Sequence, residues 1–107
     1  MRGKRGLSTV NIVYSRENEM PYDGGSRMAL YYFITECKPP ENEFNKVTYG
    51  IGVEMYINYP DKETVKERKV VESVFTDRRL AVKFLNILCE SFVTPTTLAD
   101  VIYDYIA

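Results

Sequence analysis

The 107-residue sequence contains no histidine and no tryptophan. Without histidine, the chain lacks the usual serine and cysteine triads, histidine-ligated zinc sites and the commonest general base near neutral pH. A P-loop and a dinucleotide-binding glycine motif are also missing, because the short match at Gly50 and Gly52 continues as an extended pattern where a helix would have to begin. The sequence therefore predicts a protein that is not an enzyme, with no catalytic residue, no metal ligand and no cofactor.

Cysteine is scarce, with only Cys37 and Cys89 in the chain. Their spacing fits no metal motif, and we expect each to be a small buried hydrophobe. The sequence has no signal peptide and no apolar run of membrane-spanning length. Because a secreted domain of this size usually carries more cysteines, we expect a cytoplasmic protein with reduced thiols and no membrane contact.

Excess charge of either sign is also lacking, since the formal net charge is −1. The chain as a whole therefore has no field that favours nucleic acid or an anionic membrane. The exception is the segment 1–6 (MRGKRG), which holds Arg2, Lys4 and Arg5 and no acid. We expect residues 1–7 to be a flexible basic arm, and contact of this arm with phosphate is the alternative.

Residues 47–59 (VTYGIGVEMYINY) carry the pattern around which the other segments are organised. Their odd positions from Tyr49 to Ile57 are all apolar, and their even positions are mostly small or polar. A period of two predicts a strand with one buried face. Similar reasoning predicts strands over residues 8–15, with Val10, Ile12 and Tyr14 on one face, and over residues 27–37 and 63–75.

Three parts of the strand pattern leave questions open. Residues 16–26 are polar and contain Pro21 and two glycines, so we expect a turn or longer loop there, as for residues 38–45. The segment 27–37 is apolar at both odd and even positions, so the pattern does not say which face is buried. A helix is an alternative for residues 64–72, because lysine and glutamate are good helix formers.

Apolar residues recur at helical spacing in the last third of the chain. Thr76 and Asp77 are candidate N-caps for a first helix, and Thr94-Pro95 marks the start of a second. The two predicted apolar faces comprise Leu80, Ala81, Phe84, Leu85, Ile87, Leu88 and Phe92, then Leu98, Val101, Ile102, Tyr105 and Ile106. Four strands before two helices predict a single α+β domain over residues 1–107, a four-stranded antiparallel meander with both helices on one face.

The sheet face that the helices leave open is the candidate interaction surface. Glycine weakens a strand unless a ring lies over the bare backbone or another surface approaches, so the two glycines need a reason. An aromatic ring from strand 27–37 is one explanation, and a partner's side chain or a peptide is the other. The residues predicted for this surface are Tyr31, Phe33, Gly50, Gly52, Glu54 and Tyr56.

Carboxylates offer the one acid–base alternative. Glu54 and Glu72 would lie on adjacent strands, where a carboxylate pair could serve a small enzyme. The other interpretation is that both face outward and pair with lysine or arginine. A nucleic-acid alternative uses the basic arm on phosphate with sheet tyrosines stacked on bases of a single strand.

Two segments, YGIGVEMY at residues 49–56 and VTPTTLADVIYDYI at residues 93–106, resemble a family of small uncharacterised proteins from clostridial Firmicutes. The resemblance covers the chain from about Val47 onward, and the family's function is unknown. A histidine often precedes the leucine of its second motif, whereas Thr97 stands before Leu98 here, so no role of that histidine carries over. The resemblance implies the α+β fold and a bacterial cytoplasmic setting, with no site residue or cofactor.

These observations leave the biochemical function unknown and favour a non-enzymatic interaction or regulatory module. Its expected partner is a second copy or another protein, bound through the open sheet face, rather than nucleic acid or a membrane.

Overall fold

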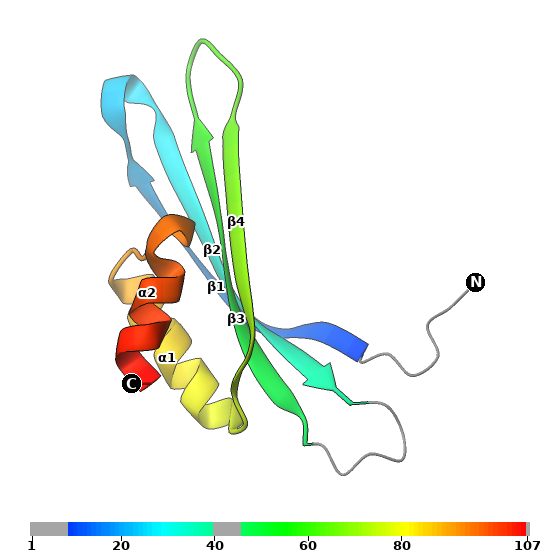
Figure 1. Cartoon of the computed structure of the whole chain (residues 1–107). Coiled ribbons are helices and arrows are strands. Elements are labelled where there is room, and N and C mark those ends of the chain that lie inside the picture. Colours follow the sequence, from blue (N-terminus) through cyan, green and yellow to red (C-terminus); the bar gives the residue numbers. More distant parts are fainter. Residues whose placement is uncertain (1–8, 40–45, 107) are drawn as a thin grey trace, which may run out of the picture.

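The computed structural model describes residues 9–39 and 46–106. Within these ranges the chain forms a four-stranded antiparallel sheet whose strand order follows the sequence. Two helices come after the strands and lie together against one face of the sheet (Figure 1). The elements are β1 (Thr9–Pro21), β2 (Arg27–Lys38), β3 (Thr48–Asn58), β4 (Val65–Phe75), α1 (Arg78–Glu90) and α2 (Pro95–Ile106). The predicted α+β meander is confirmed, whereas the arm over residues 1–7 lies outside the described residues.

Strand β3 lies inside the sheet and pairs along its length with β2 and β4. Its alternate side chains Ile51, Val53, Met55 and Ile57 are buried in the core, as the period of two predicts. The core continues onto the two helices, with Phe84, Leu85, Leu88, Leu98 and Ile102 among its members.

The face of β2 that packs against the helices, which the sequence left open, is the one that carries Leu30, Tyr32 and Ile34. These three side chains are fully buried beneath the helices. Phe33 and Thr35 on the other face are also buried. The phenol of Tyr32 donates a hydrogen bond to the carbonyl oxygen of Val93, at 2.8 Å, in the connection between α1 and α2. Burial, with a smaller contribution from nearby Cys89, raises the pKa of the Tyr32 phenol above its ordinary range. The phenol therefore stays protonated, and its hydrogen bond holds the segment between α1 and α2 against β2.

Strand β1 is longer than the sequence predicts, because residues 16–21 continue the strand instead of forming a loop. Each of them pairs with β2, as far as Pro21 opposite Arg27. The turn is short, with a 3₁₀ segment, Asp23–Gly25, whose two glycines have φ values of 64° and 81°. The polar composition of residues 16–20 wrongly indicated a loop. An edge strand can carry polar side chains and still form backbone hydrogen bonds with the one strand beside it.

A register shift between Ile12 and Tyr14 also overturns the prediction that these two residues share a face. Ile12 is 60% exposed, whereas Tyr14 is half-buried and packs against the core. The shift is typical of a β-bulge, which adds a residue to one strand and changes the facing beyond it.

Strand β4 forms as predicted, so the helical alternative for residues 64–72 is wrong. Backbone pairing with β3 runs from Val65 opposite Ile57 to Phe75 opposite Tyr49. A second register shift lies near its end, where Ser73 has a φ of 56°.

The helices start where the capping residues indicate. Asp77 is the N-cap of α1, and its Oδ1 accepts a hydrogen bond from the backbone N–H of Arg79 at 2.8 Å. Both predicted apolar faces are wider than the observed ones. Exposed members are Leu80 and Ile87 of α1, Phe92 beyond its end, and Tyr105 and Ile106 of α2. A helix buries only the side chains that contact the sheet or the other helix. The helical spacing of apolar residues therefore overestimates how many of them are buried.

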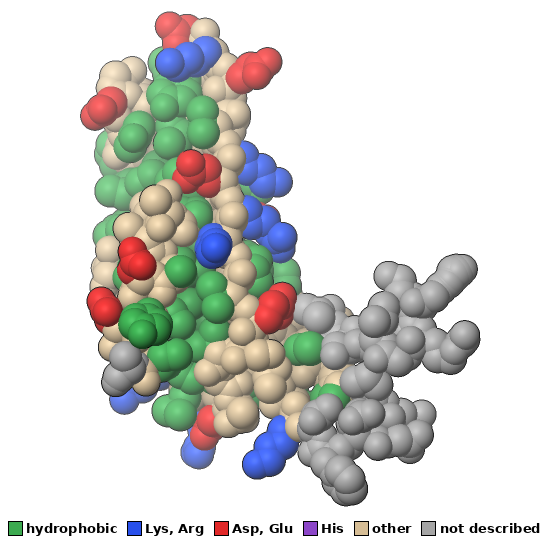
Figure 2. All heavy atoms as spheres, viewed as in Figure 1, with side chains coloured by type: hydrophobic (Ala, Val, Ile, Leu, Met, Phe, Trp, Pro, Cys, Tyr) green, Lys and Arg blue, Asp and Glu red, His purple; other side chains and the backbone are tan. Residues whose placement is uncertain are grey.

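The far ends of the two hairpins extend beyond the helices (Figure 1). On their helix side, a cross-strand row of apolar side chains continues from the core: Met20, Met28, Ile57 and Val65. Figure 2 shows hydrophobic side chains on this part of the surface.

Candidate interaction surface on the open face of the sheet

The open face is the side of the sheet opposite the helices, and the cross-strand register places its residues in rows. All six residues predicted for the candidate surface lie on it, contributed by β2 and β3. Three rows, each read from β1 to β4, define its centre: Ser15, Phe33, Gly52 and Val70; Glu17, Tyr31, Glu54 and Arg68; Glu19, Ala29, Tyr56 and Lys66.

The aromatic explanation for the strand glycines is the one observed at Gly52. The ring of Phe33 lies so close over Gly52 that a Cβ at this position would overlap it. Phe33 is only 5% exposed, and the guanidinium of Arg68 lies 5.3 Å from its ring centroid. Gly50 is packed differently, against the hydroxyl of Thr35 and the backbone of β4. Phe33 is therefore mainly part of the sheet's own packing.

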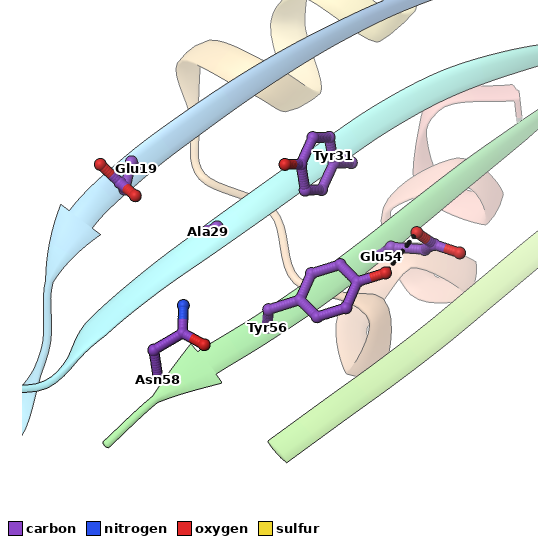
Figure 3. Close-up of a pocket in the computed structure, with 6 residues that line it drawn as sticks. All are labelled: Glu19, Ala29, Tyr31, Glu54, Tyr56 and Asn58. Carbon is purple, nitrogen blue, oxygen red and sulfur yellow. Dashed lines mark hydrogen bonds between the residues drawn. The ribbon is translucent and has the colours of Figure 1, made fainter. Parts of the chain in front are cut away.

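Tyr31 and Tyr56, the first exposed and the second half-buried, form the aromatic centre of the open face. Their rings meet edge to face with centroids 5.8 Å apart and an interplanar angle of 89°. Tyr31 is 39% exposed. The hydroxyl of Tyr56 donates to Glu54 Oε1 at 3.1 Å, as Figure 3 shows, and Lys66 Nζ lies 5.5 Å from the Tyr56 ring centroid.

Glu54 is held between two partners from the same face. Its Oε2 lies 2.7 Å from Arg68 Nε, and its Oε1 accepts the hydrogen bond from Tyr56. Glu72 lies further along β4, where its Oε1 accepts a 3.4 Å hydrogen bond from the Thr35 hydroxyl. The structure thus does not pair Glu54 with Glu72, and Glu54 has the arginine partner of the outward-facing interpretation.

Two shallow hollows meet at Tyr31 and Glu54. The larger, of about 390 Å³, is lined by Glu19, Ala29, Tyr31, Glu54, Tyr56 and Asn58 (Figure 3). The smaller, of about 220 Å³, is lined by Ile12, Ser15, Tyr31, Phe33, Glu54 and Arg68.

Sequence reasoning missed the residues that β1 contributes to these hollows. Glu19 stood in a predicted loop, and Ile12 was assigned to the same face as Tyr14. The sequence did not identify Ala29 as part of the surface. Its role is to leave space between larger side chains on the neighbouring strands, and this depends on the strand pairing. The sequence offers no signal for Glu17 and Glu19, because residues 16–20 have no apolar period.

Other chemistry is sparse in the described part of the chain. Cys89 is buried as predicted, whereas Cys37 is only half-buried, and both are free thiols. Residues 9–39 and 46–106 contain no cluster of three or more metal-ligating side chains. Over the same residues, neither helix has the length and apolar character that crossing a membrane requires.

Comparison with known proteins identifies a family but no activity. A family model described as a family of unknown function (DUF6514) matches residues 11–107. The match includes the first half of the chain as well as the segments on which the resemblance was based. No curated protein and no solved structure matches the chain.

Proposed function

The chain belongs to DUF6514, a family of unknown function, and from the geometry of the open face we propose that it is a non-enzymatic protein-interaction module that self-associates through this face. The observation that carries the proposal is an aromatic pair at the centre of the sheet face that neither helix covers, with Tyr31 exposed and Tyr56 half-buried. Tyr31 and Tyr56 supply apolar rings with polar tips, a combination that is enriched in protein interfaces.

The surroundings of the aromatic pair resemble an interface in their distribution of polarity. Phe33 and Gly52 provide a flat buried floor beside the pair, and charged side chains of β1 and β4 stand at the two margins. An apolar centre with a polar rim is the usual anatomy of a protein interface. Tyrosine and arginine, both present here, are also the side chains that most often dominate binding energy.

The two alternatives from the sequence have less support. For the enzyme, Glu54 is occupied by Arg68 and Tyr56 and is separated from Glu72. For nucleic acid, the basic arm lies outside the described residues, and Glu17 and Glu19 stand on the same face as the tyrosines. Carboxylates repel a phosphate backbone, so the open face favours a protein partner.

The proposal includes a bacterial cytoplasmic setting of clostridial type. It is supported by the motifs at residues 49–56 and 93–106, together with the two free thiols Cys37 and Cys89.

The test is sedimentation velocity over a concentration series from about 10 μM to 1 mM, a range suited to weak association. We expect the average mass to rise from that of the 12.4 kDa chain toward twice this value. Tyr31→Glu should keep the protein monomeric, because it places a charge in the centre of the contact. The matched control is Tyr103→Glu on α2, where the side chain is 71% exposed on the opposite side. A wild-type monomer throughout, or equal association of the Tyr31→Glu variant, would overturn the proposal.

A further inference from the structure

The charges of the open face are divided between its two margins. In the row that contains Ala29 and Tyr56, the acid Glu19 stands on β1 and the base Lys66 stands on β4. The neighbouring row repeats this order with Glu17 on β1 and Arg68 on β4. Figure 2 shows basic side chains along the β4 side of the molecule. In these two rows the face is therefore acidic along β1 and basic along β4, and the acid Glu72 lies further along β4, outside them.

From this division we infer that two copies pair face to face about a two-fold axis that runs along the strands. This inference rests on the proposed self-association and specifies its geometry. An axis along the strands places β1 of one copy over β4 of its partner, and each row over the same row of the partner. Glu19 then faces the partner's Lys66 twice in the dimer, and Glu17 faces the partner's Arg68 twice.

The alternative closed arrangement has its axis across the strands and places β1 over β1 and β4 over β4. It opposes acids to acids and bases to bases, and like charges placed together across an interface cost affinity. Both arrangements suit the stacking of two twisted sheets, in which strand directions stay within about 30° of each other. Charge is thus what selects the axis along the strands.

The larger hollow of the open face gives the partner's Lys66 a place to enter. It lies over Ala29, whose small side chain leaves a gap between Glu19 on β1 and Tyr56 on β3. Its walls offer carboxylates and two tyrosine rings, groups that attract an ammonium group. Glu19 already accepts a bond from Arg27 at Oε1, at 3.1 Å, and its carboxylate has a second oxygen for the incoming lysine.

The size of the contact predicts a weak and reversible dimer. Four strands about 4.8 Å apart and the three rows about 6.8 Å apart give a footprint of roughly 400 Å² on each copy. A total of about 800 Å² lies below the size of most specific, stable interfaces and in the range of weak encounters. We expect a dissociation constant in the micromolar range or weaker, and one that rises with salt concentration because the charged margins are solvated.

The test uses charge reversal within the single row that holds Glu19 and Lys66. Glu19→Lys and Lys66→Glu should each weaken self-association about tenfold or more, because two attractions per dimer become repulsions. The double variant Glu19→Lys/Lys66→Glu should self-associate like the wild type, since both contacts are restored with exchanged signs. Lys69→Glu is the matched control, because this exposed lysine of β4 stands opposite Val53 on the other face and its reversal should leave association unchanged.

Mixing experiments then separate the two possible axes. Fluorescently labelled wild type titrated with the double variant should bind at least tenfold more weakly than with wild type, because acid then meets acid and base meets base. Tighter binding of the mixed pair would overturn the inference in favour of the axis across the strands. Ala29→Leu, which fills the hollow, should weaken association with little change in melting temperature, and unchanged association would overturn the docking of Lys66 there.

The outcomes also distinguish this inference from the proposed function. If the wild type never associates, both fall together. A second outcome is that Tyr31→Glu abolishes association while the charge variants of Glu19 and Lys66 behave like wild type. In that case the open face is the interface, but the two-fold axis does not run along the strands.

Discussion

Replacing Gly52 by alanine should destabilise the protein, although alanine suits a strand better than glycine does. The added Cβ would fall on the end of the Phe33 ring, which lies directly over this position. To accommodate it, the ring must move away from a site where it is 5% exposed and where Arg68 covers its other side. The clash therefore acts on a nearly buried ring that can move only toward the smaller hollow beside it.

The expected size of the effect follows from two opposing contributions. Exchange of a strand glycine for alanine gains about 0.5–1 kcal/mol through the smaller entropy of the unfolded chain. Insertion of a methyl group into a packed site costs about 1–3 kcal/mol. The net expectation for Gly52→Ala is a loss of about 1–2 kcal/mol in the free energy of unfolding, or about 5–10 °C in melting temperature for a domain of this size.

A double-mutant cycle with Phe33→Leu isolates the cause. Leucine keeps an apolar side chain at position 33 but lacks the ring atoms that lie over Gly52. In the Phe33→Leu background, Gly52→Ala should be neutral or stabilising by up to about 1 kcal/mol, so the coupling energy should be about 1–3 kcal/mol. Urea unfolding followed by circular dichroism measures all four proteins. An equal loss from Gly52→Ala in both backgrounds would show that the ring does not explain the glycine.

Two further predictions concern the helix layer. Tyr32→Phe should lower the free energy of unfolding by about 1 kcal/mol at pH 7, since it removes the hydrogen bond to Val93. Because the pKa of Tyr32 is raised in the folded state, the stability that this phenol contributes is fully present below about pH 10 and is lost as the pH rises above that value. The difference in the free energy of unfolding between wild type and Tyr32→Phe should therefore shrink in urea titrations at alkaline pH. A difference that grows with pH would contradict this. Asp77→Ala should cost about 1 kcal/mol through loss of the N-cap of α1, and Asp77→Asn should restore most of it. Thermal unfolding of the three proteins checks the cap, and equal melting temperatures for Asp77→Ala and wild type would contradict it.

The candidate surface was predicted in part. Its central strands were predicted from the alternation of apolar residues with small or polar ones along β3, and a ring over Gly52 was among the alternatives. The sequence did not predict the margin of the candidate surface on β1. Residues 16–20 have no apolar period, so the sequence carries no sign that Glu17 and Glu19 continue a strand and join the open face.

The sequence by itself determined the order of the elements and the buried faces of β3 and of most of α1 and α2. Local rules suffice for these features, since side-chain periodicity and capping residues such as Asp77 act within one segment. Tertiary structure decided which face of β2 is buried, where β1 ends and how Ile12 and Tyr14 divide between the two faces. It also decided which residues stand opposite one another across the strands, because register depends on pairing between segments and a bulge changes the facing of the residues beyond it.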